Sequence, residues 1–246
     1  LLRYEIIYLP QKINSIIETT PPKGNNEKVI YAIVFGSDQG LVGQFNDSLA
    51  DFVSQSLQSI AEKKEIWSVG ERVQLLLSDM GYDTTKKFTV PNSVDAITPL
   101  VQQILVESEA VFNKNKANEV YIFHNQPKSA ANYVPVMQRL LPLDEKWRQS
   151  FSALEWPTKL IPQIIGGFES TLLALIHSYL FTSLFKACAE SLASENASRL
   201  AAMQRAEKNI EELLEELSHK FNSLRQSTID EELFDVVSGF EVMKKK

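Results

Sequence analysis

One long stretch without helix-breaking residues constrains this chain more than any other feature. From Phe168 to Ser238 the sequence contains neither glycine nor proline, and strong helix formers such as alanine, leucine, glutamate and lysine dominate it. About 70 residues at 1.5 Å per residue form a helix on the order of 100 Å long. One domain cannot cover so long a rod, so the stretch predicts that other polypeptide segments bury part of it.

The second half of this predicted helix carries a short coiled-coil pattern. Every seventh residue is apolar, and further apolar residues lie beside the repeat, as in the seam of a coiled coil. A seam of this kind requires a partner helix, whereas the first half is apolar enough to lie against a domain or another helix. The residues predicted to pack in the seam are Met203, Ile210, Leu214, Leu217, Phe221 and Leu224.

The beginning of the chain also follows a helical pattern. Apolar residues recur at helical spacing from Leu2 to Ile17, and the first residue is Leu1 rather than methionine. We therefore expect residues 1–20 to be the remnant of a longer N-terminal helix that this sequence largely lacks. Such a helix, packed antiparallel to the C-terminal one, or else other subunits, would cover the seam.

Between these helical regions, short apolar runs alternate with amphipathic segments. The run Val29–Phe35 is apolar throughout and rich in β-branched residues, which is typical of a strand buried on both faces. The alternation predicts an α/β domain over residues 28–165 with an open, mostly parallel sheet, followed by the long helix over 167–240. Asn46 is predicted to cap the first helix of this domain. The other predicted strands are 65–69, 86–90, 119–124 and, at an edge, 134–143, and the predicted helices are 46–62, 71–80 and 94–112.

Composition limits the classes of function. The chain has 25 basic and 31 acidic residues and a formal net charge of −6, so it shows no electrostatic footprint for nucleic acid or for an anionic membrane. No apolar run reaches the roughly 18 residues that a membrane-spanning helix needs. One cysteine and three scattered histidines give no structural zinc pattern. The expected partners are therefore proteins.

Individual motifs do not indicate catalysis. The segment Gly36–Asn46 lies between a strand and a helix, where phosphate loops occur, but it has neither the Walker A pattern nor Gly-x-Gly-x-x-Gly spacing. Its glycines are better explained by a tight turn and close packing. His124, His177 and His219 lack suitably spaced partners, and Cys188 is interpreted as a small buried apolar residue. No catalytic residue, metal ligand or cofactor is predicted.

Charged residues on the long helix are interpreted in the same structural way. The carboxylates between Glu211 and Glu216 form a solvated face opposite the apolar stripe. Glu195 with Arg199, and Glu216 with Lys220, have the i, i+4 spacing of helix ion pairs. Neither set predicts acid–base chemistry.

Two segments together resemble the gamma subunit of F-type ATP synthases. The first runs from Phe35 to Asn46, and the second runs from Glu190 to Met203 and continues in a looser match to Gly239. The resemblance spans nearly the whole chain, and the second segment is the more specific one. The residues that match the family signatures are Ser37, Asp38, Gly40, Leu41, Gly43, Phe45 and Asn46 in the first segment and Ser194, Glu195 and Arg199 in the second.

This resemblance implies a Rossmann-like domain joined to an antiparallel coiled coil of the N- and C-terminal helices, which is the rotor shaft of the complex. The implied partners are the ring of alternating alpha and beta subunits, the epsilon subunit and the c-ring of the membrane sector. The shaft would have no catalytic site and no cofactor, and would couple ion flow to ATP synthesis or hydrolysis at the beta subunits. The seam residues would pack the shaft. The implied partner contacts are Arg225 and Gln226, facing beta-subunit loops, with Asp230, Glu232 and Asp235 nearby.

The resemblance also implies a peripheral membrane complex on the cytoplasmic face of a prokaryotic inner membrane. Two alternatives stay open at this point. One is a nucleotide-binding α/β enzyme that uses the Gly36–Asn46 loop. The other is a coiled-coil adaptor that self-associates through the seam.

Overall fold

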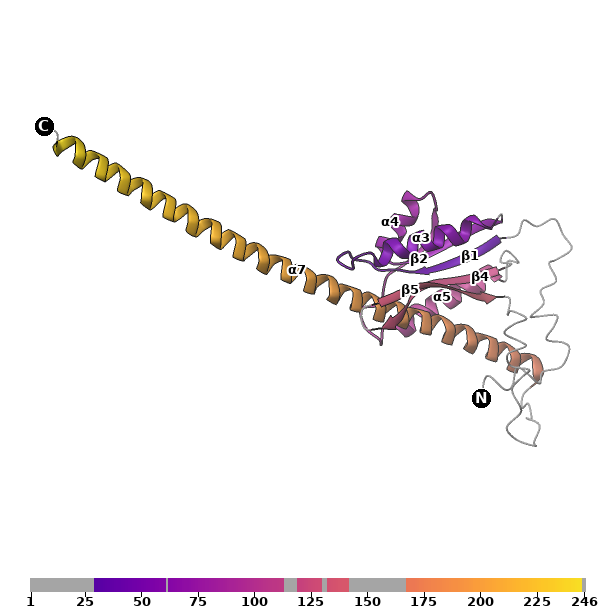
Figure 1. The fold of residues 1–246 in the computed structure, drawn as a ribbon. Coiled ribbons are helices and arrows are strands. Elements are labelled where there is room, and N and C mark those ends of the chain that lie inside the picture. The colour runs from indigo at the N-terminus through magenta and orange to yellow at the C-terminus, as the bar shows by residue number, and fades with distance from the viewer. Residues whose placement is uncertain (1–28, 61, 113–118, 130–131, 142–166, 245–246) are drawn as a thin grey trace. The chain divides into compact units, whose positions relative to one another are not determined.

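The computed structural model describes residues 29–60, 62–112, 119–129, 132–141 and 167–244 (Figure 1). The predicted N-terminal helix over residues 1–20 lies outside the described residues. The chain divides into two compact units, Leu1–Arg199 and Leu200–Lys246.

A five-stranded sheet forms the centre of the first unit. Its strand order is β3-β2-β1-β4-β5, with the first four strands parallel and β5 antiparallel to β4 at one edge. The prediction of a mostly parallel sheet with a late edge strand is confirmed. The strands are β1 (Val29–Phe35), β2 (Lys63–Val69), β3 (Thr84–Phe88), β4 (Glu119–Ser129) and β5 (Asn132–Leu141).

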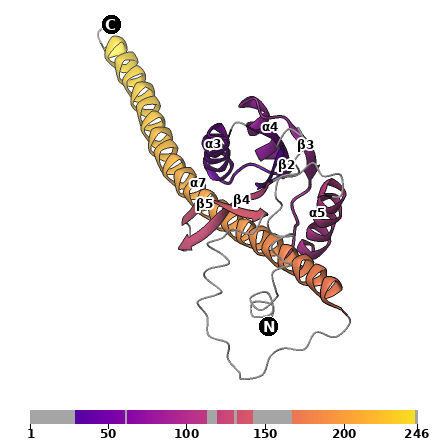
Figure 2. The same cartoon turned by 90° about the vertical axis from the view of Figure 1, so that its right-hand side faces the viewer.

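Helices cover both faces of this sheet and give the first unit three layers (Figure 2). Along β1, Ala32 and Val34 belong to one apolar core, whereas Ile33 and Phe35 belong to the other, because alternate side chains of a strand point to opposite faces. Helices α3 and α4 close the first core, and α5 and the first part of α7 close the second. The helices are α3 (Phe45–Gln58), α4 (Glu71–Asp79), α5 (Ile97–Phe112) and α7 (Phe168–Lys244).

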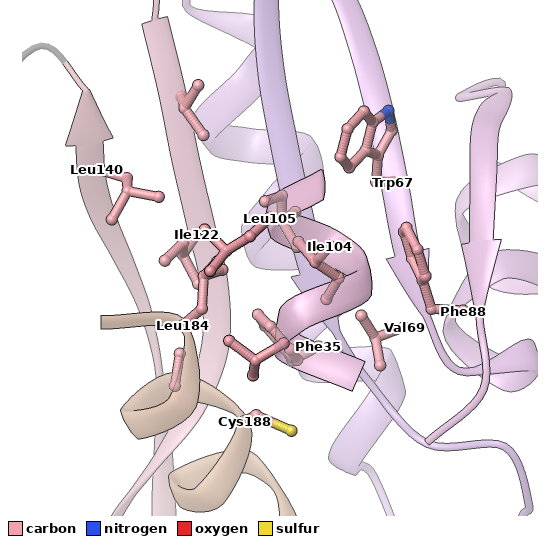
Figure 3. Close-up of a cluster of buried hydrophobic side chains, with 14 of the residues drawn as sticks. Phe35, Trp67, Val69, Phe88, Ile104, Leu105, Ile122, Leu140, Leu184 and Cys188 are labelled. Atoms are coloured by element: carbon pink, nitrogen blue, oxygen red, sulfur yellow. The ribbon is translucent and has the colours of Figure 1, made fainter. Parts of the chain in front are cut away.

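The first part of α7 is an integral part of this core. Leu180, Leu184 and Cys188 recur at helical spacing and are each less than a tenth exposed. Figure 3 shows Leu184 and Cys188 turned toward the side chains of Phe35 and Ile122 on the sheet. Full burial of one leucine contributes about 2 kcal/mol, so this stripe fixes α7 to the sheet.

The ends of some elements differ from the prediction. Helix α7 begins directly after Gly167, as expected, but it continues through Gly239 to Lys244 because that glycine keeps an ordinary helical conformation. The prediction that Asn46 caps α3 is wrong. The helix already begins at Phe45, and the Asn46 side chain is buried against Ser37 instead.

Candidate functional site

The segment after β1 is held by side-chain bonds to its own and neighbouring backbone. The Ser37 amide donates to Asn46 Oδ1 (3.0 Å), and Asn46 Nδ2 donates to Ser37 Oγ (2.8 Å). The Asp38 carboxylate accepts the amides of Glu71 and Val90, both at 3.0 Å. Asp38 thus satisfies the first amide of α4 and places a negative charge at the positive end of that helix. These signature residues join three loops at one edge of the sheet.

Glycine is required at two positions of this segment, for a different structural reason at each. A Cβ on Gly36 would lie 2.4 Å from two carbon atoms of Val73 on α4, so only glycine permits this close approach. Gly43 has a φ of 58° and needs the freedom of glycine for its turn. Gly40 shows neither a positive φ nor crowding, so the turn-and-packing interpretation does not apply to it.

The signature residues Leu41 and Phe45, and Val42 between them, differ sharply in exposure. Leu41 adopts a left-handed conformation with a φ of 60° and is 77% exposed, whereas the next residue, Val42, is buried. Phe45 is fully buried, its ring contacts Tyr133 edge to face, and its carbonyl accepts Asn125 Nδ2 at 2.9 Å. The segment therefore anchors itself through Val42 and Phe45 and presents Leu41 to the outside.

The second signature segment, on α7, lies against the first. Three serine hydroxyls donate to backbone carbonyls: Ser191 to Phe35 (3.0 Å), Ser194 to Asn125 (3.0 Å) and Ser198 to Val42 (2.6 Å). All three serines are buried. Two segments separated by about 150 residues in the sequence are thus brought together at the edge where β1 ends. Only Ser194 was among the predicted signature residues, although the i, i+3, i+7 spacing of the three serines continues the apolar stripe of α7.

Glu195 and Arg199 form the predicted ion pair, with Glu195 Oε1 2.6 Å from Arg199 Nη2. Unlike an ordinary surface pair, Glu195 is only 4% exposed. Burial raises the pKa of Glu195 above its ordinary value, Arg199 opposes this shift, and the Asp38 carboxylate adds to it. The second carboxylate oxygen of Glu195 has no partner within the described part of the chain. The glutamate of this pair is therefore buried where α7 packs on the first unit, and only the arginine is partly exposed.

His124 has a partner that the sequence did not reveal. Its Nε2 lies 2.8 Å from Glu190 Oε2 on α7, and Lys186 and Gln126 approach the other oxygen of Glu190. Burial lowers the pKa of His124, and Glu190 opposes that shift. His124 and Glu190 are 66 residues apart, so no sequence spacing predicts their contact. The pair links β4 to α7 next to the serines.

Cys188 has the role expected of a small apolar residue. It is 2% exposed, and burial raises the pKa of its thiol to about 12. A thiol with such a pKa remains protonated at neutral pH and is a poor nucleophile. The second core therefore contains this cysteine as packing.

Several of the backbone amides near this loop that could bind a phosphate group are already bonded within the chain. The Ser37 amide is bonded to Asn46, and the amides of Glu71 and Arg72 at the start of α4 are bonded to Asp38 and to the Ser37 carbonyl. An incoming phosphate would displace these bonds and meet the Asp38 carboxylate. The geometry favours the structural interpretation of the loop over nucleotide binding.

The described residues contain neither a cluster of metal ligands nor a membrane-spanning helix. No group of three or more His, Cys, Asp or Glu side chains there could hold a metal ion. None of the helices in the described ranges combines the length and hydropathy of a membrane span.

The second unit is a helix with apolar side chains on its surface. Its described part, from Leu200 to Lys244, belongs to α7 and has a length of about 65 Å at 1.5 Å per residue. The predicted seam residues are 50–69% exposed, and the predicted partner contacts are exposed as well. The seam residues are Met203, Ile210, Leu214, Leu217, Phe221 and Leu224, and the partner contacts are Arg225, Gln226, Asp230, Glu232 and Asp235.

A second group of exposed apolar residues follows further along the same helix. Ile229, Leu233, Val236 and Phe240 share one side of the helix and are each at least half exposed, and Phe234 (70%) and Val237 (48%) lie further round from them. At 100° per residue, this group lies roughly 110° around the helix from the seam residues. The unit therefore presents two apolar faces in succession along its length.

The family match and the similar proteins of known name agree with each other. The sequence matches the family described as ATP synthase over residues 8–243. It is 29% identical over 236 residues to the ATP synthase gamma chain of Clostridium pasteurianum, covering 95% of this chain and 81% of the relative. The gamma chain of Bdellovibrio bacteriovorus is 28% identical over 246 residues, covering 94% of this chain and 80% of the relative.

Solved structures show the same fold. A chain in the structure of Euglena gracilis mitochondrial ATP synthase, OSCP/F1/c-ring in rotational state 3, superposes with a TM-score of 0.63 at 19% identity, covering 98% of this chain and 80% of that chain. A chain in the structure of the rotor of the same enzyme, in rotational state 1, gives a TM-score of 0.58 at 18% identity, covering 93% and 83%. At these identities the likeness concerns the fold alone.

Proposed function

This chain belongs to the ATP synthase gamma family, and we propose that it is the central-stalk rotor subunit of a rotary ATP synthase. Its partners are the alpha and beta subunits of the hexameric ring, the epsilon subunit and the c-ring of the membrane sector. It belongs to a membrane-associated complex, and its position is on the cytoplasmic face of a prokaryotic inner membrane. The chain itself catalyses no reaction and holds no cofactor.

The observation that carries this proposal is the apolar surface of the second unit. Leu214, Leu217 and Phe221 are each about 60% exposed on a helix that is otherwise rich in charge. Exposed stripes of this length mark surfaces that other polypeptides cover. The seam residues pack against the N-terminal helix of the shaft, to which residues 1–20 contribute. The apolar face around Leu233 turns toward the subunits of the ring.

We assign different functions to successive regions of the chain. Residues 28–165 form the Rossmann-like domain that seats on the c-ring with the epsilon subunit, and residues 167–240 form the shaft. Between the two apolar faces, Arg225 and Gln226 contact beta-subunit loops, with Asp230, Glu232 and Asp235 beside them. A charged and polar segment between apolar ones suits a contact that must form and break during each turn.

The mechanism requires no bond-making by this chain. An asymmetric shaft inside the ring gives the three beta subunits different surroundings, so their nucleotide affinities differ at any moment. Rotation of the shaft exchanges these affinities, which is a coupling of binding free energies between distant sites. A continuous helix suits the task because its backbone hydrogen bonds resist local deformation.

Reconstitution tests the proposal. The full-length chain is co-expressed with alpha and beta subunits, and a probe is attached through Gln55→Cys on an exposed position of α3. Cys188 does not compete for the label because it is buried and its thiol has a pKa of about 12. We expect co-purification with both subunits, ATP-driven rotation of the probe, and no ATP hydrolysis by the isolated chain.

The alternatives give other outcomes in the same preparations. Tight binding of ATP or NAD by the isolated chain in calorimetry, weakened by Gly43→Ala, would support an enzyme. Self-association through the seam without capture of alpha and beta subunits would support an adaptor. Either result, with no rotation, would overturn the rotor proposal.

A further inference from the structure

The face of α7 that lies on the sheet changes its chemistry along the helix. Leu184, Ala187 and Cys188 contribute apolar side chains to the second core. One turn further, near the end of β1, the same face continues with buried Ser191, Ser194 and Ser198. The helix thus replaces apolar packing by hydroxyl groups where it leaves the sheet.

Each of these hydroxyl groups bonds to a different segment of the backbone. Ser191 reaches the last residue of β1, Ser194 reaches β4, and Ser198 reaches the loop between β1 and α3. Serine side chains are short, so a bond from Oγ to a fixed carbonyl constrains both the position and the rotation of the helix backbone. Apolar contacts are non-directional and permit small sliding movements of packed helices.

We infer that Ser191, Ser194 and Ser198 form a joint that carries torque between the α/β domain and the shaft helix. This inference rests on the proposed rotor function. Bonds to three separate backbone segments oppose rotation of α7 about its own axis relative to the sheet, whichever way the rotor turns. The serines are positioning residues, because they act on the helix and contact no nucleotide.

The test uses rotation of the complete complex with the probe at Gln55→Cys. The triple variant S191A/S194A/S198A removes three hydroxyl groups and no other atoms. At low ATP, between rotation steps, we expect a wider spread of probe angles than in the parent complex, because the domain that carries the probe is less firmly tied to the shaft. If the triple variant does not fold, S194A alone and the pair S191A/S198A are measured.

Two control variants separate this joint from general destabilisation. Thr182→Val removes a hydroxyl group whose bond, to the Ser178 carbonyl, stays within α7. Val53→Ala weakens the opposite core, beneath α3. Both are expected to keep the narrow spread of angles, even where Val53→Ala lowers the melting temperature as much as the serine variants do.

The outcomes distinguish the two proposals. If the parent complex does not rotate, the proposed rotor function is overturned, independently of the results for the serine variants. If the parent complex rotates and the serine variants show the same angular spread as Thr182→Val, the joint fails. A spread that follows only the melting temperature, so that Val53→Ala widens it equally, also overturns the joint.

Discussion

The two parts of α7 present the same secondary structure in opposite environments. Before Arg199 the apolar stripe of Leu180, Leu184 and Cys188 is buried within the first unit, whereas from Leu200 on the large apolar side chains of the described helix are 48–71% exposed. Burial inside the chain contributes to the stability of the chain, and burial by partners contributes to assembly. Substitutions on one helix should therefore separate these two quantities.

The largest expected effect is on assembly. Leu217→Asp places a charge in the proposed seam, where it would be buried without a partner at a cost of several kcal/mol. We expect a strong loss of co-purification with alpha and beta subunits, while the melting temperature of the first unit is unchanged. Ser218→Asp, which adds the same charge beside the stripe, is the control. An unchanged yield of the Leu217→Asp complex would contradict the seam assignment.

The next effect is on the stability of the isolated chain. Leu184 is fully buried in the second core, so Leu184→Ala should lower the free energy of unfolding of the first unit by about 2–5 kcal/mol. Leu214→Ala, at a site that is 59% exposed, should change it by less than about 0.5 kcal/mol. Denaturant unfolding of both variants measures the difference. Equal losses would show that the two parts of α7 are not distinct in the free chain.

Two glycines extend the comparison to the backbone. Gly36→Ala should destabilise the first unit by about 1–3 kcal/mol, because the new methyl group would overlap Val73. Gly239 has open space around it and lies inside a helix, so Gly239→Ala should stabilise α7 by about 0.5–1 kcal/mol. Thermal unfolding and helix content report the two effects. Val73→Gly removes both of the carbon atoms that the new methyl group would meet, so a smaller loss from Gly36→Ala in the Val73→Gly background than in the parent chain would confirm the overlap, and a neutral Gly36→Ala would exclude it.

Much of the fold could be predicted because its signals are local. The apolar run of β1 and the absence of glycine and proline after Gly167 specify a buried strand and a long helix without any tertiary information. The prediction that Asn46 caps α3 failed because it used local sequence alone. An asparagine at a helix start is a good cap in isolation, but its side chain is taken by Ser37 nine residues earlier.

The contacts of the signature residues could be predicted only in part. The resemblance placed Ser194 and Asp38 among signature residues, but their bonds run to Asn125, Glu71 and Val90, which are distant in sequence. Contacts of this kind depend on the order of strands in the sheet. Similarly, nothing near His124 in the sequence indicates Glu190. The seam residues, in contrast, could be predicted from the sequence, because their heptad spacing is visible without a structure.

A pH dependence of stability is expected in the first unit. The pKa of buried His124 lies below its ordinary value of 6.5, so the unfolded chain takes up a proton more readily than the folded one. Stability is therefore retained above pH 6.5 and falls as the pH drops below it toward the pKa of the folded state. Glu190 and Lys186 are the charged groups that face this histidine.

Replacing His124 tests whether it causes this loss of stability at low pH. His124→Gln keeps a donor for Glu190 but does not titrate, so part of the loss of stability below pH 6.5 should disappear. Denaturant unfolding on both sides of that pH measures it, with His219→Gln in the second unit as the control. A profile for His124→Gln identical to that of the parent chain would mean that His124 does not set the pH dependence.

The smallest expected effect comes from two ion pairs of equal spacing on the two parts of α7. Glu216–Lys220 (2.5 Å) is mostly exposed, so a double-mutant cycle should give a coupling of about 0.3–0.5 kcal/mol that salt weakens. Glu195–Arg199 (2.6 Å) has a glutamate side chain that is only 6% exposed, so its coupling should be larger and less sensitive to salt. The N···O distances are nearly the same, and equal couplings with equal salt dependence would therefore show that burial does not distinguish the two parts of this helix.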